Sequence, residues 1–474
     1  MKKFFITVLA TVLAWSGSIS AQIKINPDME IGQIKPMNAV NNGPRMEQSD
    51  GSQTMVSSLA YFKAANMGFS RNHDASGCDY FGGFHIVDMS QLFPDFSKNP
   101  EKPESYDFTL TDEYVKYILS TGMEVFFRLG QSIEQYAKKY DVWPPKDFKK
   151  WAVIAEHVIR HYNEGWADGY HFNIRYWEIW NEPDLDWNTG KWSTMPRTWG
   201  GSPEQFWDFY ETVAKHLKKK FPELKIGGPA MSGSDINDPN VPKWFELFIS
   251  EMASRKVPLD FFSWHRYDYV PERFADQARQ VRAILDKYGY TRAESNLNEW
   301  TYMKSWTEDF SYSMETIASV KGSAFFCAVM QECQDAPLDM LMYYDARPNT
   351  NFNGIINFRT NTPLPGYWAY YAWGKLRSLG TRIAASSSDP EVRVTAAKGS
   401  EGSLALLVSR YCQDDNVTSS KRIRVKLESG RFSGKVRCHI MDKYNFYTEY
   451  PVALQEDGTL LLQLYPHSFV FVEE

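Results

Sequence analysis

The sequence lacks a cysteine framework. Its five cysteines are an odd number at irregular spacing, whereas small secreted proteins held together by disulfides carry an even and denser set. Cys327 and Cys333 lie six residues apart in a predicted helix, about 9 Å along its axis, which is too far for a disulfide. Spacing alone does not decide whether Cys412 and Cys438 pair. Disulfides therefore do not define this fold.

The hydrophobic run near the N-terminus is too short to span a membrane. Residues 4–15 form a largely apolar segment of twelve, whereas a spanning helix needs about 20 residues. Lys2 and Lys3 precede this segment and small residues follow it at 16–21, which is the pattern of a secretory signal peptide. We therefore expect residues 1–21 to be a signal peptide cleaved after Ala21, with no cysteine at the cut for a lipid anchor, and the mature protein to be secreted or periplasmic.

The chain also carries little excess of one sign of charge. The formal net charge is −6 over 474 residues, and acidic and basic residues are mixed along the chain, so nucleic acid is a poor candidate partner. Aromatic residues, in contrast, make up 15% of the chain, with 16 Trp and 27 Tyr. Flat aromatic faces suit ligands with an apolar face and a hydroxylated rim, as sugars have, although a large barrel also buries many aromatics. The composition favours a carbohydrate partner and leaves the oligomeric state open.

Short apolar segments alternate with amphipathic stretches between residues 33 and 345. Eight candidate strands begin near Ile34, Met67, Met123, Ile174, Leu224, Asp260, Ala293 and Asp339. Helix signals lie between them: Ser202 to Gln205, for example, is a capping box with Pro203 at the first helical position. Eight strand–helix units in series predict a (β/α)8 TIM barrel of the α/β class over residues 22–377. All the loops that follow the strands should then open on one face.

The pattern changes after Arg377. Short alternating segments follow, separated by turn residues such as Asp389-Pro390 and Asp457-Gly458. They predict a C-terminal all-β sandwich domain of about seven or eight strands over residues 378–474. Because no flexible linker precedes it, we expect this domain to pack closely against the barrel, either as a rigid support or as a sugar-binding module.

Two carboxylates end predicted strands on the same face of the barrel. Glu182 follows Asn181 at the end of the fourth strand, and Glu299 ends the seventh, 117 residues later (299 − 182). Glycoside hydrolysis requires one carboxylic acid to protonate the leaving oxygen and one carboxylate to attack the anomeric carbon. Glu178 and Glu294 lie deeper on the same strands and are better interpreted as structural groups. The pattern predicts that Glu182 and Glu299 face each other across about 5 Å.

Several short segments match a known family in order. They are Asn41–Pro44, Arg71–His73, Tyr106–Phe108, Pro144–Asp147, Glu178–Asp184, Gly227–Ala230, Ser263–Tyr267 and Asn298–Trp300. Over residues from about 35 to 375 the chain resembles glycoside hydrolase family 39, the β-xylosidase and α-L-iduronidase family of clan A. The resemblance implies a clan A barrel with one catalytic carboxylate on the fourth strand and one on the seventh.

The resemblance also implies roles for individual residues. Glu182 would be the general acid/base and Glu299 the nucleophile, with retention of configuration. Asn181 would bind the hydroxyl next to the anomeric carbon, and Tyr267 would contact the nucleophile. The family pattern further places Arg71, His73 and His265 in the first subsite.

The chain departs from the family pattern at two positions. On the eighth strand it has Tyr343-Tyr344-Asp345, where the family usually has a Tyr-Trp pair. Either Tyr344 replaces this Trp as the floor under the sugar, or a different sugar binds there. Trp300-Thr301 follows the nucleophile, where the family more often has an aromatic residue and then Asn; we expect Trp300 to bind substrate. These differences leave the mechanism intact and the identity of the sugar open.

Other motifs predict no metal or cofactor. His157 and His161 have the i, i+4 spacing of zinc ligands, but no Glu follows His157 as a zincin requires. The acidic run that begins at Asp184 has Thr189 where a calcium loop has Gly. No Gly-x-Ser-x-Gly elbow is present. Double displacement by two Glu requires neither a metal nor an organic cofactor.

The sequence therefore predicts a retaining glycoside hydrolase, exo-acting on β-xylosides or related plant or host glycans. Two alternatives remain. A non-catalytic glycan-binding barrel would be expected to have lost a catalytic carboxylate, and both are present. An endo-acting clan A glycosidase would be favoured if the loop over residues 184–201, with Trp187, Trp192 and Trp199, formed a substrate groove.

Overall fold

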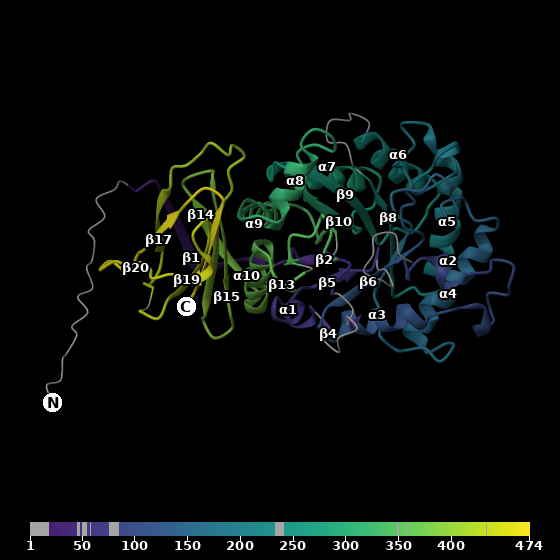
Figure 1. Cartoon of the computed structure of the whole chain (residues 1–474), viewed down its shortest axis with the longest axis horizontal. Coiled ribbons are helices and arrows are strands. Elements are labelled where there is room, and N and C mark those ends of the chain that lie inside the picture. The colour runs from purple at the N-terminus through teal and green to yellow at the C-terminus, as the bar shows by residue number, and fades with distance from the viewer. Residues whose placement is uncertain are drawn as a thin grey trace.

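The computed structural model places a barrel beside an all-β domain (Figure 1). It describes residues 19–44, 48–49, 55–56, 58–74, 85–232, 241–347, 350–357, 359–432 and 434–474. Residues 1–18 of the predicted signal peptide lie outside the described residues. No helix within the described ranges combines the length and apolar character needed to cross a bilayer.

The predicted TIM barrel is confirmed, because eight parallel strands close on themselves. Their order round the barrel is β2 (Ala39–Asn41), β5 (Phe69–Arg71), β6 (Glu124–Leu129), β7 (Tyr176–Ile179), β8 (Lys225–Met231), β9 (Phe261–Asp268), β10 (Glu294–Tyr302) and β11 (Met340–Tyr343). Every one of these strands falls in a segment that the hydrophobic pattern selects. Since all eight are parallel, their carboxyl ends meet at one mouth.

Helices connect the strands. They are α1 (Leu59–Ala64), α2 (Met89–Leu92), α3 (Thr109–Ser120), α4 (Phe148–Glu164), α5 (Pro203–Lys220), α6 (Val241–Ser254), α7 (Glu272–Lys287), α8 (Phe310–Ile317), α9 (Val320–Asp335) and α10 (Pro365–Leu379), with 3-10 turns at Pro103–Ser105 and Lys191–Ser193. The capping box that starts α5 is present: the Gln205 N–H donates to Ser202 Oγ, and the Ser202 N–H donates to Gln205 Oε1. Local sequence thus fixes where this helix begins.

The interior of the barrel changes from apolar to polar along its axis. Its lower layer is an apolar cluster: Ala39, Phe69, Phe126, Tyr176, Phe261, Met340 and Met342. Two residues further along three of these strands the inward side chain is polar: Asn41 follows Ala39, Arg71 follows Phe69 and Glu178 follows Tyr176. The apolar layer therefore closes the bottom of the barrel, and the polar layer above it forms the base of the mouth.

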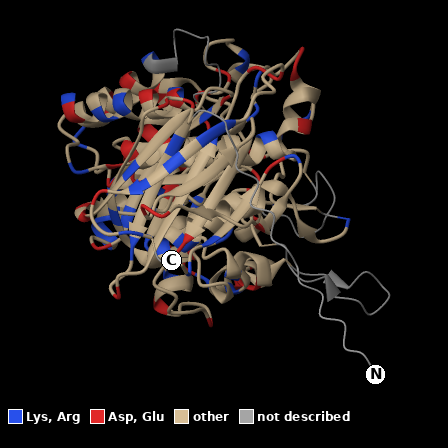
Figure 2. Cartoon of the chain, turned by 90° about the vertical axis from the view of Figure 1, so that its left-hand side faces the viewer, with Lys and Arg blue, Asp and Glu red and all other residues tan. Residues whose placement is uncertain are grey.

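The all-β domain is also confirmed, as one ten-stranded hydrogen-bonded sheet (Figure 2). Its strand order is β19 (Phe446–Glu449), β18 (Arg437–Met441), β22 (Ser468–Glu473), β16 (Leu404–Arg410), β15 (Val392–Lys398), β14 (Thr381–Ser387), β1 (Ala21–Gln33), β17 (Lys421–Leu427), β21 (Leu460–Leu464) and β20 (Ala453–Leu454). Two small hairpins lie apart from both sheets: β3 (Gln48–Ser49) with β4 (Met55–Val56), and β12 (Ile356–Asn357) with β13 (Thr362–Pro363).

The domain boundary predicted at residue 22 needs a correction. β1 pairs with β14 and with β17, so residues 21–33 belong to the C-terminal sheet and not to the barrel. Ile23 and Ile25 are fully buried in the core of that sheet. Alternation along the segment predicts a strand, but it carries no information on which sheet the strand joins.

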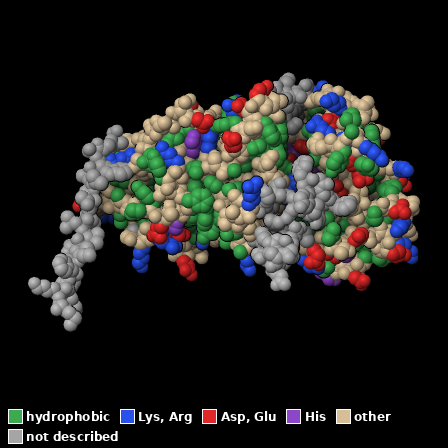
Figure 3. All heavy atoms as spheres, in the orientation of Figure 1, with side chains coloured by type: hydrophobic (Ala, Val, Ile, Leu, Met, Phe, Trp, Pro, Cys, Tyr) green, Lys and Arg blue, Asp and Glu red, His purple; other side chains and the backbone are tan. Residues whose placement is uncertain are grey.

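The two domains share a continuous hydrophobic junction. Along β22, Phe471 belongs to the core cluster of the barrel, whereas its neighbours Val470 and Val472 belong to the core of the sheet. Gln331 of α9 crosses the junction: its Nε2 donates to Leu407 O at 2.9 Å. In the space-filling view, hydrophobic side chains gather over the boundary between the domains (Figure 3). The expected close packing is thus present.

The described cysteines are buried and free. They are Cys327, Cys333, Cys412 and Cys438; Cys78 lies outside the described residues. Cys412 and Cys438 therefore do not form the pair that the sequence left open.

We predict that Phe471→Ala destabilises both domains together. The side chain is 1% exposed at the junction, and its removal leaves a cavity that costs about 3–5 kcal/mol. Thermal unfolding followed by far-UV and near-UV circular dichroism should show one transition at a lower temperature. Phe446→Ala, at a side chain that is 50% exposed, is the control and should change stability by less than about 0.5 kcal/mol. An early transition of the sheet alone, with the barrel unchanged, would show that the domains are not coupled.

Candidate active site

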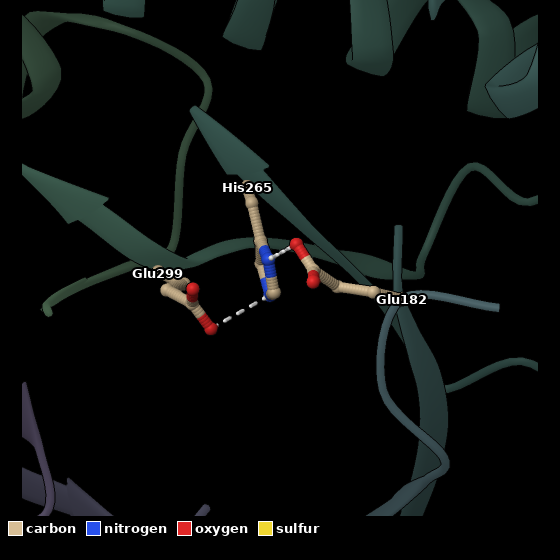
Figure 4. Close-up of side chains that lie close together, drawn as sticks. All are labelled: Glu182, His265 and Glu299. Carbon is tan, nitrogen blue, oxygen red and sulfur yellow. Dashed lines mark hydrogen bonds and ion pairs between the residues drawn. The ribbon is translucent and has the colours of Figure 1, made fainter. Parts of the chain in front are cut away.

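Glu182 and Glu299 lie together at the mouth of the barrel. With His265, they present three potential ligand atoms that all lie within 4.8 Å of one another (Figure 4). Both Glu side chains are nearly buried, with 8% of Glu182 and 6% of Glu299 exposed. The expected spacing of the two carboxylates is therefore present in the structure.

Glu182 is held by strained backbone just beyond β7. Its φ is 48°, and that of Trp180 is 75°, both in the left-handed region that non-glycine residues rarely adopt. Such positions cost of order 1–3 kcal/mol each and persist where surrounding contacts fix them. Here the Glu182 N–H donates to Ala230 O at 2.9 Å, and Thr198 Oγ1 donates to the Glu182 carbonyl. These contacts turn the side chain towards His265.

Glu299 is placed by an irregularity in β10. The register with β9 shifts between Leu297 and Glu299, which leaves Asn298 as an extra residue. As a result two consecutive side chains point inward: Asn298 Nδ2 donates to Glu178, and Glu299 contacts His265. A regular strand would turn one of the two away from the mouth.

Arg71 hydrogen-bonds to four polar residues at the base of the mouth. Its buried guanidinium donates to Glu178 at 2.7 Å, Asn41 at 3.0 Å, Asn181 at 2.7 Å and Glu299 at 3.3 Å. Glu178 also accepts from Ser263 Oγ and Asn298, so this deeper Glu is a structural group, as interpreted from the sequence. Glu294, the other rival carboxylate, pairs with Lys225 at the start of its strand.

His265 lies between the two carboxylates, as Figure 4 shows. Its Nδ1 is 2.9 Å from Glu182 Oε1, and its Nε2 is 3.5 Å from Glu299 Oε2. Burial lowers the pKa of His265 to about 4, although the Glu299 charge opposes this shift. The ring is therefore neutral near pH 7 and carries one N–H.

Burial raises the pKa of both carboxyls. The pKa of Glu182 and that of Glu299 each rise to about 7 because the charged forms lose solvation. Glu299 accepts hydrogen bonds from Tyr267 Oη and Arg71 Nη1, both of which favour its ionised form. Because like charges repel across the pair, the two carboxyls together hold about one proton near neutral pH, and the two donors on Glu299 favour the negative charge there.

Tyr344 and His73 lie at two different depths. Tyr344 is half-buried, and its ring lies 6.5 Å from that of Tyr267 at 80°. Its hydroxyl donates to Asp74 Oδ2 at 2.7 Å. His73 is 3% exposed and accepts from Arg128 Nε at 3.1 Å. Tyr344 thus forms part of the wall, whereas His73 belongs to the buried network behind it.

Trp300 does not line the mouth. Because successive side chains of a strand point to opposite faces, an inward Glu299 sends Trp300 outward. There it is fully buried among Phe274, Phe325, Phe326 and Tyr343. The expectation that Trp300 binds substrate is therefore wrong.

Two of the three tryptophans of the 184–201 loop, Trp187 and Trp199, do not line a groove. Trp187 is 6% exposed and Trp199 is 1% exposed, and both rings contact Phe206 of α5. Sequence analysis missed Trp306, which is 47% exposed and lies 5.0 Å from the ring of Tyr267. The sequence signal for Trp306 is its position in the loop after β10, because the loops that follow the barrel strands surround the mouth.

The donor set at the mouth suits proton transfer better than metal binding. Glu182, His265 and Glu299 are close enough to hold an ion. However, a metal requires both carboxylates to be deprotonated, whereas burial and mutual repulsion favour one proton on the pair. One protonated and one ionised carboxyl are the groups needed to donate a proton and to attack carbon.

Comparisons with known proteins give a family and a fold. The profile described as Glycosyl hydrolases family 39 matches residues 63–344. A beta-xylosidase of Caldicellulosiruptor saccharolyticus is 24% identical over 402 residues, which are 78% of this chain and 77% of that protein. A glucosidase structure from Croceicoccus marinus superposes with a TM-score of 0.75 at 22% identity, over 96% of this chain and 99% of that one. A monomeric beta-xylosidase structure from Caulobacter crescentus CB15 superposes at 0.68 with 15% identity, over 95% and 99% of the two chains.

We predict that Glu182→Gln stabilises the protein above neutral pH. The folded pKa of about 7 lies above the unfolded value of about 4.3, so the native state loses stability as the pH rises between these values. A neutral amide avoids this loss, and the melting temperature at pH 8 should rise by roughly 1–3 °C, with a smaller gain at pH 5.

Glu156→Gln is the matched control with the opposite sign. Glu156 is also buried, but hydrogen bonds from Arg160, His216 and Lys220 outweigh its desolvation and lower its pKa. Its substitution should lower the melting temperature at pH 8. If Glu182→Gln is as destabilising as Glu156→Gln, the Glu182 carboxyl is not strained by burial.

Proposed function

The chain belongs to glycoside hydrolase family 39, and on this premise we propose that it is a retaining, exo-acting glycosidase in which Glu182 is the acid/base and Glu299 the nucleophile. The observation that carries the proposal is the distance within 4.8 Å between oxygens of the two Glu side chains. Retaining enzymes hold their carboxyl groups about 5–5.5 Å apart, whereas inverting enzymes leave about 6.5–9.5 Å for a water molecule.

The proposed reaction has two steps. Protonated Glu182 gives its proton to the glycosidic oxygen as Glu299 attacks the anomeric carbon, so the leaving group departs and a glycosyl ester forms on Glu299. The esterified Glu299 no longer repels a charge on Glu182, so the pKa of Glu182 falls. Glu182 then takes a proton from water, which attacks the same carbon and releases the sugar and free Glu299.

The neighbouring residues prepare this sequence. Tyr267 and Arg71 hold Glu299 in the ionised form needed for attack. Asn181, oriented by Arg71 at 2.7 Å, presents its Nδ2 to the hydroxyl beside the anomeric carbon. No step of this chemistry requires a metal or an organic cofactor.

We propose β-xylosides or related plant or host glycans as substrates. The similar proteins named beta-xylosidase, and the glucosidase of similar fold, support a neutral sugar bound through its hydroxyls. Tyr267, Tyr344 and Trp306 supply an aromatic wall beside Glu299. Because Trp187 and Trp199 pack into the core, they offer no extended groove, which favours exo action. We also propose that residues 1–21 direct export to the periplasm or the medium.

Glu299→Ala should abolish glycosidase activity. Without the nucleophile, kcat on an aryl β-xyloside should fall by at least about 10³-fold. Azide should restore release of the aryl group by attacking from the vacated side, and the glycosyl azide should have inverted configuration by NMR. Glu294→Ala removes the same group from the base of β10 and should retain activity. Full activity of Glu299→Ala, or an azide product with retained configuration, would refute the assignment.

Tyr267→Phe should move the acidic limb of the pH profile to higher pH. The acidic limb of kcat/KM reports protonation of Glu299, and its basic limb reports loss of the proton from Glu182. Loss of the tyrosine hydrogen bond disfavours the Glu299 carboxylate, so its pKa should rise by roughly half to one pH unit. Tyr302→Phe removes the hydroxyl of a buried tyrosine on β10, the strand that carries Glu299, and should leave both limbs in place. An unchanged acidic limb in Tyr267→Phe would assign that limb to another group.

A further inference from the structure

The outer face of the C-terminal sheet carries a row of cations. Along β17, Ile423, Val425 and Leu427 point into the core of the sheet. The alternate residues Arg422, Arg424 and Lys426 therefore lie on the opposite face. Figure 2, which views this domain from its free side, shows Lys and Arg in bands across the strands.

The neighbouring strands continue this face with cations and amides. Lys24 of β1 pairs in register with Lys426, and Gln22 pairs with Arg424. On the other side, Gln463 of β21 lies opposite Arg422. Over the paired segments Gln22–Asn26, Arg422–Lys426 and Leu461–Gln463, which the structure describes in full, no outward-facing position is Asp or Glu.

Lys24, Arg424 and Lys426 make no salt bridge with a described carboxylate, although Asp457 lies near enough for the charges of Arg424 and Lys426 to help its hydrogen bonds with Thr459 lower its pKa. Among the described residues, no carboxylate oxygen lies within 4 Å of the charged nitrogens of Lys24, Arg424 or Lys426, and Arg424 Nε has no hydrogen-bond acceptor. Other cations of the same domain are paired: Arg410 contacts Glu391, and Lys421 contacts both Asp389 and Glu391. A local positive face thus stands on a chain whose net charge is −6.

The geometry of the face fits a linear polyanion. Alternate residues of one strand lie about 6.8 Å apart, and neighbouring strands about 4.8 Å apart. Lys24, Arg422, Arg424 and Lys426 therefore form a row about 14 Å long. Fixed like charges on a low-dielectric surface raise the local concentration of an oppositely charged polymer, and the flanking Gln22 and Gln463 can hydrogen-bond hydroxyl groups.

We propose that this cationic face, defined as Lys24, Arg422, Arg424 and Lys426, binds an acidic polysaccharide, a sugar chain that carries carboxylate or sulfate groups. The choice of a polysaccharide among polyanions rests on the proposed glycosidase function. Such binding would retain the enzyme on a polymeric glycan through a site separate from the barrel mouth, and so raise the effective concentration of chain ends at Glu299.

Binding to polygalacturonate, dextran sulfate and neutral xylan tests the proposal. Isothermal titration calorimetry at low salt should detect binding to at least one of the two acidic polymers, whereas any binding of xylan at the mouth should not depend on salt. The triple variant R422Q/R424Q/K426Q should bind at least about tenfold more weakly, and salt should weaken the wild type more steeply than the variant. The carboxylate and sulfate arms distinguish which anion is preferred.

A triple variant with the same change in charge is the matched control. Lys98, Lys102 and Lys149 are exposed lysines of the barrel domain, and K98Q/K102Q/K149Q should bind as the wild type does. Both triple variants should keep the wild-type melting temperature and the wild-type activity on a small aryl glycoside, because neither alters the mouth. The expected loss is therefore specific to the sheet.

Three results would overturn the proposal. They are no binding of either acidic polymer by the wild type, equal binding by R422Q/R424Q/K426Q and the wild type, and binding of duplex DNA as tight as that of the acidic polysaccharides. Failure of the proposed function is distinguishable, because it would appear as absent aryl-glycosidase activity in the wild type. Selective loss of polymer binding in R422Q/R424Q/K426Q supports the cationic face whatever that activity is.

Discussion

The contacts of the buried Arg71 guanidinium determine the geometry of the candidate site. Arg71 joins β2, β7 and β10 through Asn41, Glu178 and Glu299. A buried cation without partners would cost several kcal/mol, so the surrounding carbonyl and carboxylate oxygens are required for the fold as well as for the chemistry. Because one guanidinium bonds Glu178 below and Glu299 above, the position of the Glu299 carboxylate is tied to the buried Glu178 beneath it.

The depth of the polar layer explains why the site can be both rigid and reactive. The apolar cluster beneath it, which includes Phe126, Tyr176 and Phe261, excludes water from the barrel axis. The carboxyls above are consequently desolvated from below, and this burial raises the pKa of both Glu182 and Glu299. Desolvation lowers the stability of the native state when both carboxyls are charged. The same desolvation keeps one carboxyl protonated near neutral pH, where it can act as an acid.

Sequence patterns predicted the features that depend on local periodicity. They did not predict the features that depend on contacts between distant parts of the chain. The eight barrel strands and the meeting of Glu182 with Glu299 follow from apolar runs and from the shared mouth of a parallel barrel. The sheet that β1 joins depends on long-range pairing, which alternation does not encode. Trp300 was placed by likeness to a family motif, although alternation from Glu299 already sends it outward. The bulge at Asn298 has no sequence signal, so the two inward side chains of β10 could not be foreseen.

A neutral His265 contacts both carboxyls, so the position of its N–H bears on which of them holds the proton. Its single N–H can lie on Nδ1, towards Glu182, or on Nε2, towards Glu299. If the N–H is on Nε2, it faces the ionised Glu299 at 3.5 Å as an electrostatic contact without a hydrogen bond, and the free lone pair of Nδ1 accepts from protonated Glu182. If it is on Nδ1, the ring donates to an oxygen of Glu182, but Nε2 then turns a lone pair towards the Glu299 carboxylate, which is unfavourable. The first tautomer agrees with the donors Tyr267 and Arg71 on Glu299. The contacts of His265, Tyr267 and Arg71 therefore favour the proposed roles, with the acid just beyond β7 and the nucleophile on β10.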